Sequence, residues 1–277
     1  MRLRSWIWPL VACGILLLVL LTAPFFSPYR VTELAGDPLE APGLRHLLGT
    51  NSVGQDIASQ MLSGMQVSVL IALLAGGGTL VLGGMMGMVA GLAGGMTDAV
   101  LMRVVDIVLV VPKLPLLIIL GAYAGQDLAT VATVIALISW PSSARVVRAQ
   151  VVSIRRRNHL KAAIGFGADM IYLLHRHVLP EIGLILAAGL VTAAGRAVML
   201  EAGLAFLGLG DPVRASWGAI IRDAFKFQGL FFTSAWIWWL LPPLFSIILL
   251  LLGLTYLGIL FEKRLNPRLS RHYVAAQ

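Results

Sequence analysis

Residues 67–93 read VSVLIALLAGGGTLVLGGMMGMVAGLA, an apolar run without a single charged residue. A bilayer core roughly 30 Å thick is spanned by about 20 residues of α-helix, so this run predicts a membrane-spanning helix. Its apolar residues are continuous and do not alternate with polar ones, which favours a helix over a strand of a membrane barrel. The whole chain agrees, because 58% of its 277 residues are hydrophobic and only 12% are charged. Such a composition excludes a water-soluble domain.

Five further apolar runs predict five more spans, at residues 6–26, 100–123, 128–147, 182–206 and 236–260. Asp106, Pro112, Lys113 and Pro115 interrupt the run at 100–123. We therefore expect an all-α integral membrane protein with six transmembrane helices. Residues 1–26 also fit a secretory signal. The run is long for a signal core, however, and its removal would leave an odd number of helices.

The distribution of Lys and Arg predicts the orientation of these helices, because short cytoplasmic loops carry an excess of both. Two arginines precede the first run, seven basic residues lie between the fourth and fifth runs, and four follow the sixth. Both termini and the loop at 155–178 are therefore expected in the cytoplasm, with the protein in an inner membrane. The net charge of +8 then reports topology and does not indicate nucleic-acid binding.

The predicted spans divide the chain into three regions. Residues 1–66 hold the first helix and an external segment, residues 67–262 hold a five-helix core, and residues 263–277 form a cytoplasmic tail. Within the core, glycines recur at four-residue spacing on one face of the second helix, and such a face lets a neighbouring helix approach closely. These glycines are Gly83, Gly87, Gly91 and Gly95.

The basic loop between the fourth and fifth runs contains a predicted amphipathic helix at 159–174. Its apolar face needs a partner, which is either the underside of the membrane bundle with its lipid headgroups or a soluble protein. The apolar members are Ala163, Phe166, Met170, Ile171 and Leu174.

Four segments carry a family resemblance, and they occur in the family's order. They are Lys161-Ala162-Ala163 with Gly167 and Leu179-Pro180; Leu48-Gly49-Thr50-Asn51 with Gly54-Gln55-Asp56; Gly94-Gly95 with Asp98, Met102-Arg103 and Asp106; and Ala205–Gly210 with Ser216-Trp217-Gly218. Together they resemble the second of the two paired permease subunits of dipeptide, oligopeptide and nickel ABC importers.

This resemblance implies a type I ABC importer permease fold that supplies half of a translocation pore. It implies a homologous permease as pore partner, two cytoplasmic ABC ATPases, an external substrate-binding protein, and a peptide, nickel or a metal chelate as cargo. The segment from Lys161 to Pro180 resembles the EAA motif, which forms a coupling helix that fits a cleft in the ATPase. The chain has no Gly-x-x-x-x-Gly-Lys-Ser/Thr element, so we expect it to bind no cofactor and its partners to use the ATP.

The sequence departs from the family pattern at three positions. Lys161 stands where the EAA motif has Glu, Asn51 where the external signature has Asp, and Gln55 where it has Arg. The glycines and the Leu-Pro pair that fix the backbone are kept. We interpret the chain as a divergent member whose contact with the ATPase lacks the expected carboxylate.

Charged residues at membrane depth are costly and point to function. Lys113 lies about 20 Å from the cytoplasmic end of its predicted helix and Arg196 about 24 Å from that of its own, and Glu201 follows nearer the outer end. We hypothesise that Lys113 and Arg196 face the translocation path and attract an anionic group of the substrate. The alternative is that they pair with Glu201 or with the partner subunit, or extend towards water.

Two further local interpretations concern the third run. Arg103 and Asp106 are three residues apart, so we expect a local ion pair, and Asp98 is expected to cap the helix. A rival function is a stand-alone proton-coupled carrier that uses Asp106, Arg196 and Glu201 as a relay. Such carriers often have two corresponding halves with broken helices, and the proline-broken third run has no convincing counterpart in the sequence.

No metal site is predicted. His175 and His177 are two residues apart and therefore point away from each other on a helix, while His46 stands alone in the external segment. Cys13 is the single cysteine, which excludes a disulfide within the chain.

Overall fold

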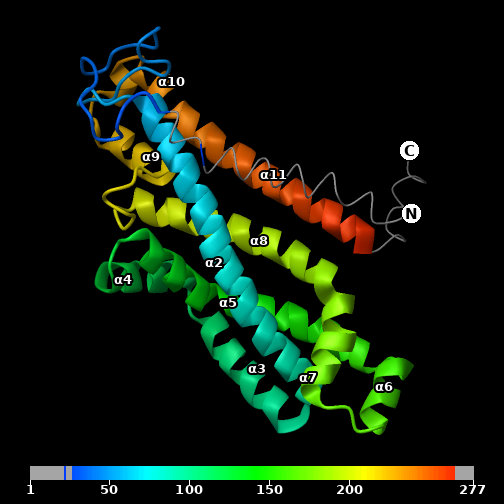
Figure 1. Cartoon of the computed structure of the whole chain (residues 1–277). Coiled ribbons are helices and arrows are strands. Elements are labelled where there is room, and N and C mark those ends of the chain that lie inside the picture. Colours follow the sequence, from blue (N-terminus) through cyan, green and yellow to red (C-terminus); the bar gives the residue numbers. More distant parts are fainter. Residues whose placement is uncertain (1–21, 23–26, 266–277) are drawn as a thin grey trace. The chain divides into compact units, whose positions relative to one another are not determined.

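The computed structural model describes residue 22 and residues 27–265, and within these residues the secondary structure is helical (Figure 1). The predicted all-α fold is confirmed. The helices are α2 (Ile57–Ala93), α3 (Gly95–Val110), α4 (Lys113–Ala124), α5 (Leu128–Arg155), α6 (Asn158–Gly165), α7 (Met170–Leu173), the π-helix η2 (Leu174–Val178), α8 (Leu179–Phe206), α9 (Trp217–Lys226), the 3-10 turn η3 (Leu230–Phe232), α10 (Ala235–Trp239) and α11 (Leu241–Leu265).

In the described residues, four helical segments are long and apolar enough to cross a membrane. They are Ile57–Ala93, Leu128–Arg155, Met170–Phe206 and Ala235–Phe261. Helices α3 and α4 provide a fifth span if the bent pair is counted as one. The span predicted at 6–26 and most of the tail predicted at 263–277 lie outside the described residues.

Helix α2 begins ten residues before the apolar run that predicted it. Asp56 caps its start, because its carboxylate accepts hydrogen bonds from the backbone N–H and the hydroxyl of Ser59, each at 2.7 Å. The first turns then carry Ser59, Gln60 and Ser63, which are buried. The apolar run missed these turns because their buried side chains are polar.

The run predicted at 100–123 is two helices that meet at an angle of 86°. Pro112 has no N–H to donate, and its ring forces Val111 into an extended conformation with φ −73° and ψ 126°. Lys113 therefore becomes the first residue of α4 and does not lie within a longer helix.

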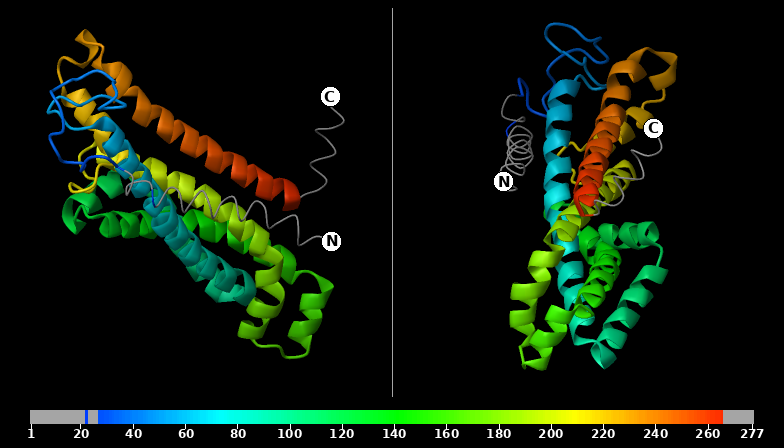
Figure 2. Two further views of the ribbon diagram at one scale, coloured as in Figure 1. Left: turned by 45° about the horizontal axis from the view of Figure 1, so that its top comes forward. Right: turned by 90° about the vertical axis from the view of Figure 1, so that its right-hand side faces the viewer.

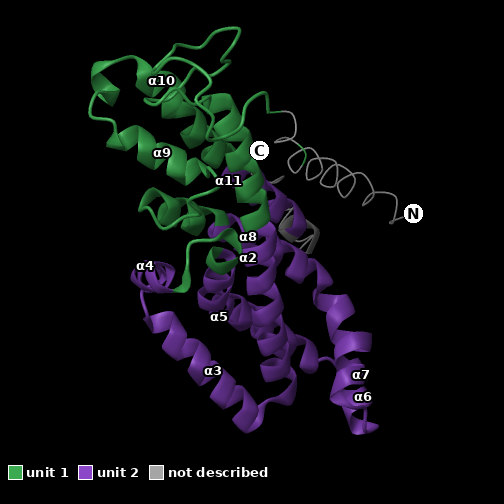
Figure 3. Cartoon of the chain, turned by 60° about the vertical axis from the view of Figure 1, so that its left-hand side comes forward, with its two compact units in different colours: residues 1–71, 124–131, 198–249 green, residues 72–123, 132–197, 250–277 purple. Residues whose placement is uncertain are grey.

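The chain divides into two compact units (Figure 3). Unit 1 takes in the residues up to 71, residues 124–131 and residues 198–249, and unit 2 takes in residues 72–123, residues 132–197 and the residues from 250 onward. Unit 1 therefore contains the segment that precedes α2, and unit 2 contains α3, α4, α6, α7 and most of α5.

Glycines bring α2 against α5 within unit 2. A Cβ on Gly83 would lie 2.5 Å from the carbonyl oxygen of Trp140, and one on Gly91 would lie 2.7 Å from the Cβ of Val151. Gly87 makes an equally close approach to Ala144. Gly95 differs from the other three, because it lies in the first turn of α3 with φ +53°, and a Cβ added to it would have no atom within 4 Å.

Candidate functional site

Unit 2 encloses a cavity of about 340 Å³ between α2, α5 and α8. Ligand pockets in proteins typically measure about 300–1,000 Å³, so the cavity is large enough for a small ligand. Its polar lining consists of Thr79 from α2, Ser139, Ser142, Ser143 and Gln150 from α5, and Thr192 and Arg196 from α8.

Two hydroxyls of this lining lack a hydrogen-bond partner. The Oγ1 atom of Thr79 and the Oγ atom of Ser139 are buried, and each unsatisfied buried group costs about 1–3 kcal/mol. Ser142 and Thr192 instead donate to backbone carbonyls of their own helices, at 2.9 Å and 3.0 Å. A polar occupant would therefore stabilise the cavity by satisfying Thr79 and Ser139. Sequence reasoning missed these residues, although polar side chains inside otherwise apolar spans were a usable signal.

The charge of the cavity is positive. Arg196 lines it with an exposed side chain, and Lys113 lies close enough to Arg196 for the two cations to repel each other. Neither cation forms an ion pair with a carboxylate in the part of the chain that the structure describes. Glu201, in unit 1, is buried and hydrogen-bonds Ser216. Two neighbouring cations without a counterion favour an anionic group at this place.

The two acidic residues of α3 are held by arginines of α5. The local pair predicted between Arg103 and Asp106 is wrong, because Asp106 pairs with Arg145 at 2.5 Å. Asp98 does not cap the helix either, since Gly94 occupies the N-cap and the Asp98 carboxylate accepts two hydrogen bonds from Arg148. The sequence spacing could not reveal these pairs, because residues far apart in the chain form them.

Residues 158–178, called the coupling segment after their resemblance to the EAA motif, form two short helices and a π-helical turn. The single helix predicted at 159–174 is wrong, because Gly167 has φ +81°, a conformation that ends a helix and that other residues rarely adopt. The N–H groups of Gly167 and Ala168 close the last turn of α6 by donating to the carbonyls of Ile164 and Ala163, at 3.0 Å and 3.1 Å. Helices α6 and α7 therefore lie side by side (Figures 1 and 2).

The coupling segment packs one side onto the bundle of unit 2. Leu160 of α6 and Leu173 of α7 join a buried cluster with Leu92, Val151 and Ile182. The underside of the bundle thus covers part of the predicted apolar face, including Ala163, Met170 and Leu174. Phe166 and Ile171 stay 92% and 67% exposed.

The segment passes into α8 without an interruption. Pro180 cannot donate a backbone hydrogen bond to the carbonyl one turn earlier, and the turn before it is π-helical, which relieves the crowding from the proline ring. Leu179 begins α8, and residues from Met170 to Phe206 form one apolar span. At the base of α8, Glu181 pairs with Arg157 and accepts a contact from Nε2 of His159 at 2.9 Å.

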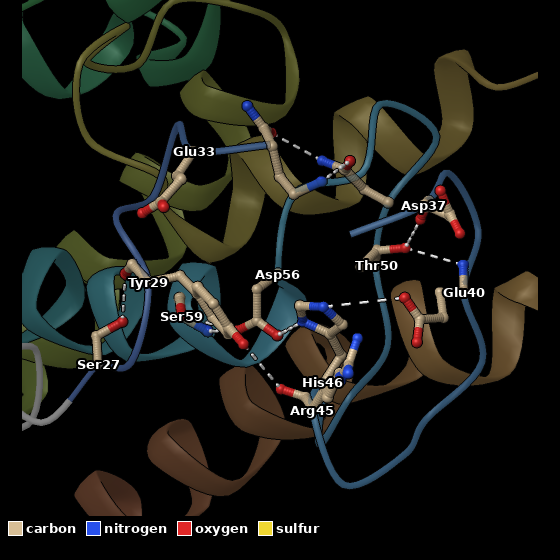
Figure 4. A network of polar contacts seen from close by, with 12 residues as sticks. Ser27, Tyr29, Glu33, Asp37, Glu40, Arg45, His46, Thr50, Asp56 and Ser59 are labelled. Carbon is tan, nitrogen blue, oxygen red and sulfur yellow. Dashed lines mark hydrogen bonds and ion pairs between the residues drawn. The ribbon is translucent and has the colours of Figure 1, made fainter. Parts of the chain in front are cut away.

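The external signature of the sequence forms a hydrogen-bonded platform in unit 1 (Figure 4). The buried ring of His46 contacts Asp56 through Nδ1 at 2.9 Å, so this histidine is not alone as the sequence implied. Thr50 donates to the carbonyl of Asp37 and accepts from the N–H of Glu40, which joins the loop at 37–40 to the segment that precedes α2. No group of three metal-ligating side chains occurs among the described residues.

The two departures in this signature form a pair with each other. Asn51 donates from Nδ2 to Oε1 of Gln55 at 2.8 Å, and Oδ1 of Asn51 accepts from the N–H groups of Val53 and Gln55. Gln60 donates to the same Gln55 oxygen at 2.8 Å. Asn51 and Gln55 thus form a neutral hydrogen-bonded pair at the two positions where the family signature has Asp and Arg.

The segments after α8 fix the end of that helix in unit 1. Gly208 has φ +88° and ends α8, with the N–H groups of Gly208 and Leu209 closing its last turn. Ser216 caps α9 by accepting from the N–H of Ala219, and Trp217 donates from Nε1 to the carbonyl of Met61 at 3.1 Å. These motif residues therefore serve helix ends and packing.

Comparison with known proteins places these features in a family. The family model described as binding-protein-dependent transport system inner membrane component matches residues 83–271. A protein of Brucella suis named as a peptide permease is 33% identical over 96% of this chain and 87% of its own length. The oligopeptide transport system permease protein OppC of Bacillus subtilis is 31% identical, over 95% and 85% respectively. The OppC protein of Mycobacterium bovis is 31% identical, over 96% and 91%.

Proposed function

Because the chain belongs to the family of inner membrane components of binding-protein-dependent transport systems, we propose that it forms half of the pore of an ATP-driven peptide importer. The observation that carries this proposal is the match at 83–271, which includes the α5 and α8 walls of the cavity and the whole coupling segment. The chain is a permease of an inner membrane and is not itself the enzyme that hydrolyses ATP.

The complete transporter would contain a homologous permease, two cytoplasmic ABC ATPases and an external binding protein. In this arrangement both termini and the coupling segment face the cytoplasm, as the distribution of Lys and Arg predicts. Closure of the ATPases would move the coupling segment. Since α7 continues into α8, and α8 lines the cavity from Ile185 to Arg196, this motion would be carried to the cavity by one continuous helix.

The proposed cargo is a peptide whose carboxylate is attracted by Lys113 and Arg196. Two neighbouring cations without an ion pair in the described residues, together with the free hydroxyls of Thr79 and Ser139, provide donors for a carboxylate and for peptide carbonyls. The names of similar proteins from Brucella and Bacillus also refer to peptides. Nickel or a metal chelate is the alternative cargo, and the cavity contains no His, Cys, Asp or Glu to bind a metal.

The first experiment tests the assembly. The chain would be purified from its native host in mild detergent through a tag at its C-terminus, and the proteins that accompany it would be identified by mass spectrometry. Recovery of a second permease and of P-loop ATPases is the expected result. A stable homo-oligomer without an ATPase, under conditions that preserve other ABC complexes, would instead favour the proton-coupled carrier. That carrier would have to use Asp106 while it is paired with Arg145.

The second experiment tests the cavity. Arg196→Ala and Lys113→Ala are each expected to reduce uptake of a labelled peptide by at least about tenfold, since loss of one charge-assisted hydrogen bond is worth about 1.5–3 kcal/mol. Lys226→Ala, which changes a cation of unit 1 outside the cavity, is the matched control. Uptake equal to wild type in both Arg196→Ala and Lys113→Ala would sink the proposed role of these two residues. Uptake of nickel in place of the peptide would identify the alternative cargo.

A further inference from the structure

A second cavity of unit 2 lies beside the coupling segment and has a volume of about 560 Å³. The end of α2, the start of α3, the last turns of α5 and helix α6 line it. It is separate from the first cavity, because the two share no lining residue. Lys161, the residue that departs from the EAA motif, is part of its wall.

The second cavity carries an excess of positive charge. Its wall holds Arg148, Arg155, Arg156 and Lys161 against a single acid, Asp98. The Asp98 carboxylate is already bound by two N–H groups of Arg148. The other three cations form no ion pair with any carboxylate of the described residues.

Neighbouring cations in one cavity repel each other, and an anionic group among them removes that repulsion. Two other acids of this region are already engaged: Glu181 contacts Arg157 and His159, and Asp169 accepts a hydrogen bond from the backbone N–H of Tyr172. The described part of the chain therefore does not supply the anion that this cavity favours. A carboxylate or a phosphate from another molecule fits its chemistry.

The surroundings of the cavity favour a protein as the source of the anion. Ile164 is in the cavity wall, and the adjoining turn and helix expose Phe166, Ile171 and Tyr172 by 92%, 67% and 50%. Aromatic and aliphatic side chains next to arginines are the composition of a protein interface core.

We propose that the ATPase subunit bound by this chain inserts a carboxylate into the second cavity, where it contacts Lys161 and Arg156. The inference rests on the proposed function, in which the coupling segment binds an ATPase. Lys161 inverts the charge of the Glu in the EAA motif, so the partner surface must be inverted with it. This chain would therefore select its own ATPase against those that present a basic residue to a Glu.

Carbodiimide cross-linking of the purified complex tests this proposal, because the reagent joins a lysine amine to a carboxylate in direct contact. The chain has four lysines, Lys113, Lys161, Lys226 and Lys263, so each linked site can be assigned by peptide mass spectrometry. The expected product joins Lys161 to an Asp or Glu of the ATPase. Lys161→Arg keeps the charge but lacks the amine, so it is expected to lose this product. Lys226→Arg is expected to retain it.

Charge reversal provides the second arm of the test. Lys161→Glu is expected to lower the amount of ATPase that co-purifies by about tenfold, and Lys161→Arg to retain several-fold more ATPase than Lys161→Glu. Size-exclusion profiles of both variants in detergent check that the permease itself is folded. Salt at about 0.5 M screens both the attraction of a carboxylate to Lys161 and its repulsion by Glu, so washing at this concentration should narrow the difference in retained ATPase between wild type and Lys161→Glu.

The outcomes separate this inference from the proposed function. If the ATPase co-purifies equally with wild type and Lys161→Glu, and no product forms at Lys161, the inference is wrong while the half-pore function stands. If wild type instead retains an anionic phospholipid that Lys161→Glu loses, again without a cross-linked ATPase, the cavity binds a lipid phosphate and the inference is also wrong. If no ATPase accompanies the wild-type chain, both proposals fail.

Discussion

The glycine contact between α2 and α5 allows a quantitative prediction for Gly83→Ala. The added Cβ would lie 2.5 Å from the carbonyl oxygen of Trp140, 2.6 Å from the Cβ of Ser143 and 2.9 Å from the backbone N of Ala144. Ordinary contact begins at 3.4 Å, so the helices must separate by several tenths of an ångström. Two of the three atoms belong to the backbone, which cannot turn away as a side chain can.

The expected free-energy change has two parts of opposite sign. Alanine favours a helix over glycine by about 1 kcal/mol, and an overpacked methyl group costs about 1–3 kcal/mol. Since backbone atoms meet this methyl group, the upper part of that range applies and Gly83→Ala should be destabilising by about 1–2 kcal/mol. Gly77→Ala on the same helix meets nothing within 4 Å and should be stabilising by about 0.5–1 kcal/mol.

Thermal unfolding of the detergent-solubilised protein, followed by tryptophan fluorescence, measures the difference between the two variants. A change of 1 kcal/mol shifts Tm by about 2–4 °C for a chain of this size. Gly83→Ala should therefore melt below wild type and Gly77→Ala at or above it. If Gly83→Ala melts as high as Gly77→Ala, α2 does not pack on α5 in this register.

Three further substitutions test the helix ends and ion pairs. Gly167→Ala places a side chain at φ +81° and should cost about 1–2 kcal/mol locally, seen as faster hydrogen exchange in the turn after α6 with little change in Tm. Asp56→Ala removes the N-cap of α2 and the partner of the buried His46 imidazole, so it should lower the free energy of unfolding by about 1–3 kcal/mol. Asp37→Ala changes an exposed side chain and should leave Tm unchanged in the same thermal unfolding experiment. Asp98→Ala should lower Tm more than Asp106→Ala, because the side chains are 18% and 51% exposed; equal shifts would contradict this ranking.

Polar residues within apolar helices explain most differences between prediction and structure. The start of α2 was missed because Ser59, Gln60 and Ser63 are buried but polar. The sequence pointed to Arg196 of the cavity because of its charge. It did not point to Thr79 and Ser139, because hydroxyl side chains are also common in helices that line no cavity. A charged residue such as Arg196 could be recognised because a charge inside a membrane is costly. Which polar side chains share a cavity with it depends on helix packing and could not be predicted.

Backbone breaks were predicted in some places and missed in others. Pro112 was a visible interruption, and the structure turns it into a bend of 86°. Gly167 was recognised only as a member of a motif, and its φ of +81° ends α6 inside a segment whose apolar periodicity resembled one helix. Periodicity reports which side chains can share a face, but a single left-handed residue redirects the chain after it.

The sequence alone determined that this chain is helical, that it lies in a membrane and that it resembles an ABC importer permease. These properties depend on local quantities: the length of apolar runs, the positions of prolines and glycines, and short motifs in a fixed order. The tertiary structure alone decided that Asp98 and Asp106 bind arginines of α5, and that Lys161 joins three arginines in one cavity. The strength of an ion pair depends on the distance between the two charges in space. The packing of α2, α3, α5 and α6 sets that distance for residues that are far apart in the sequence.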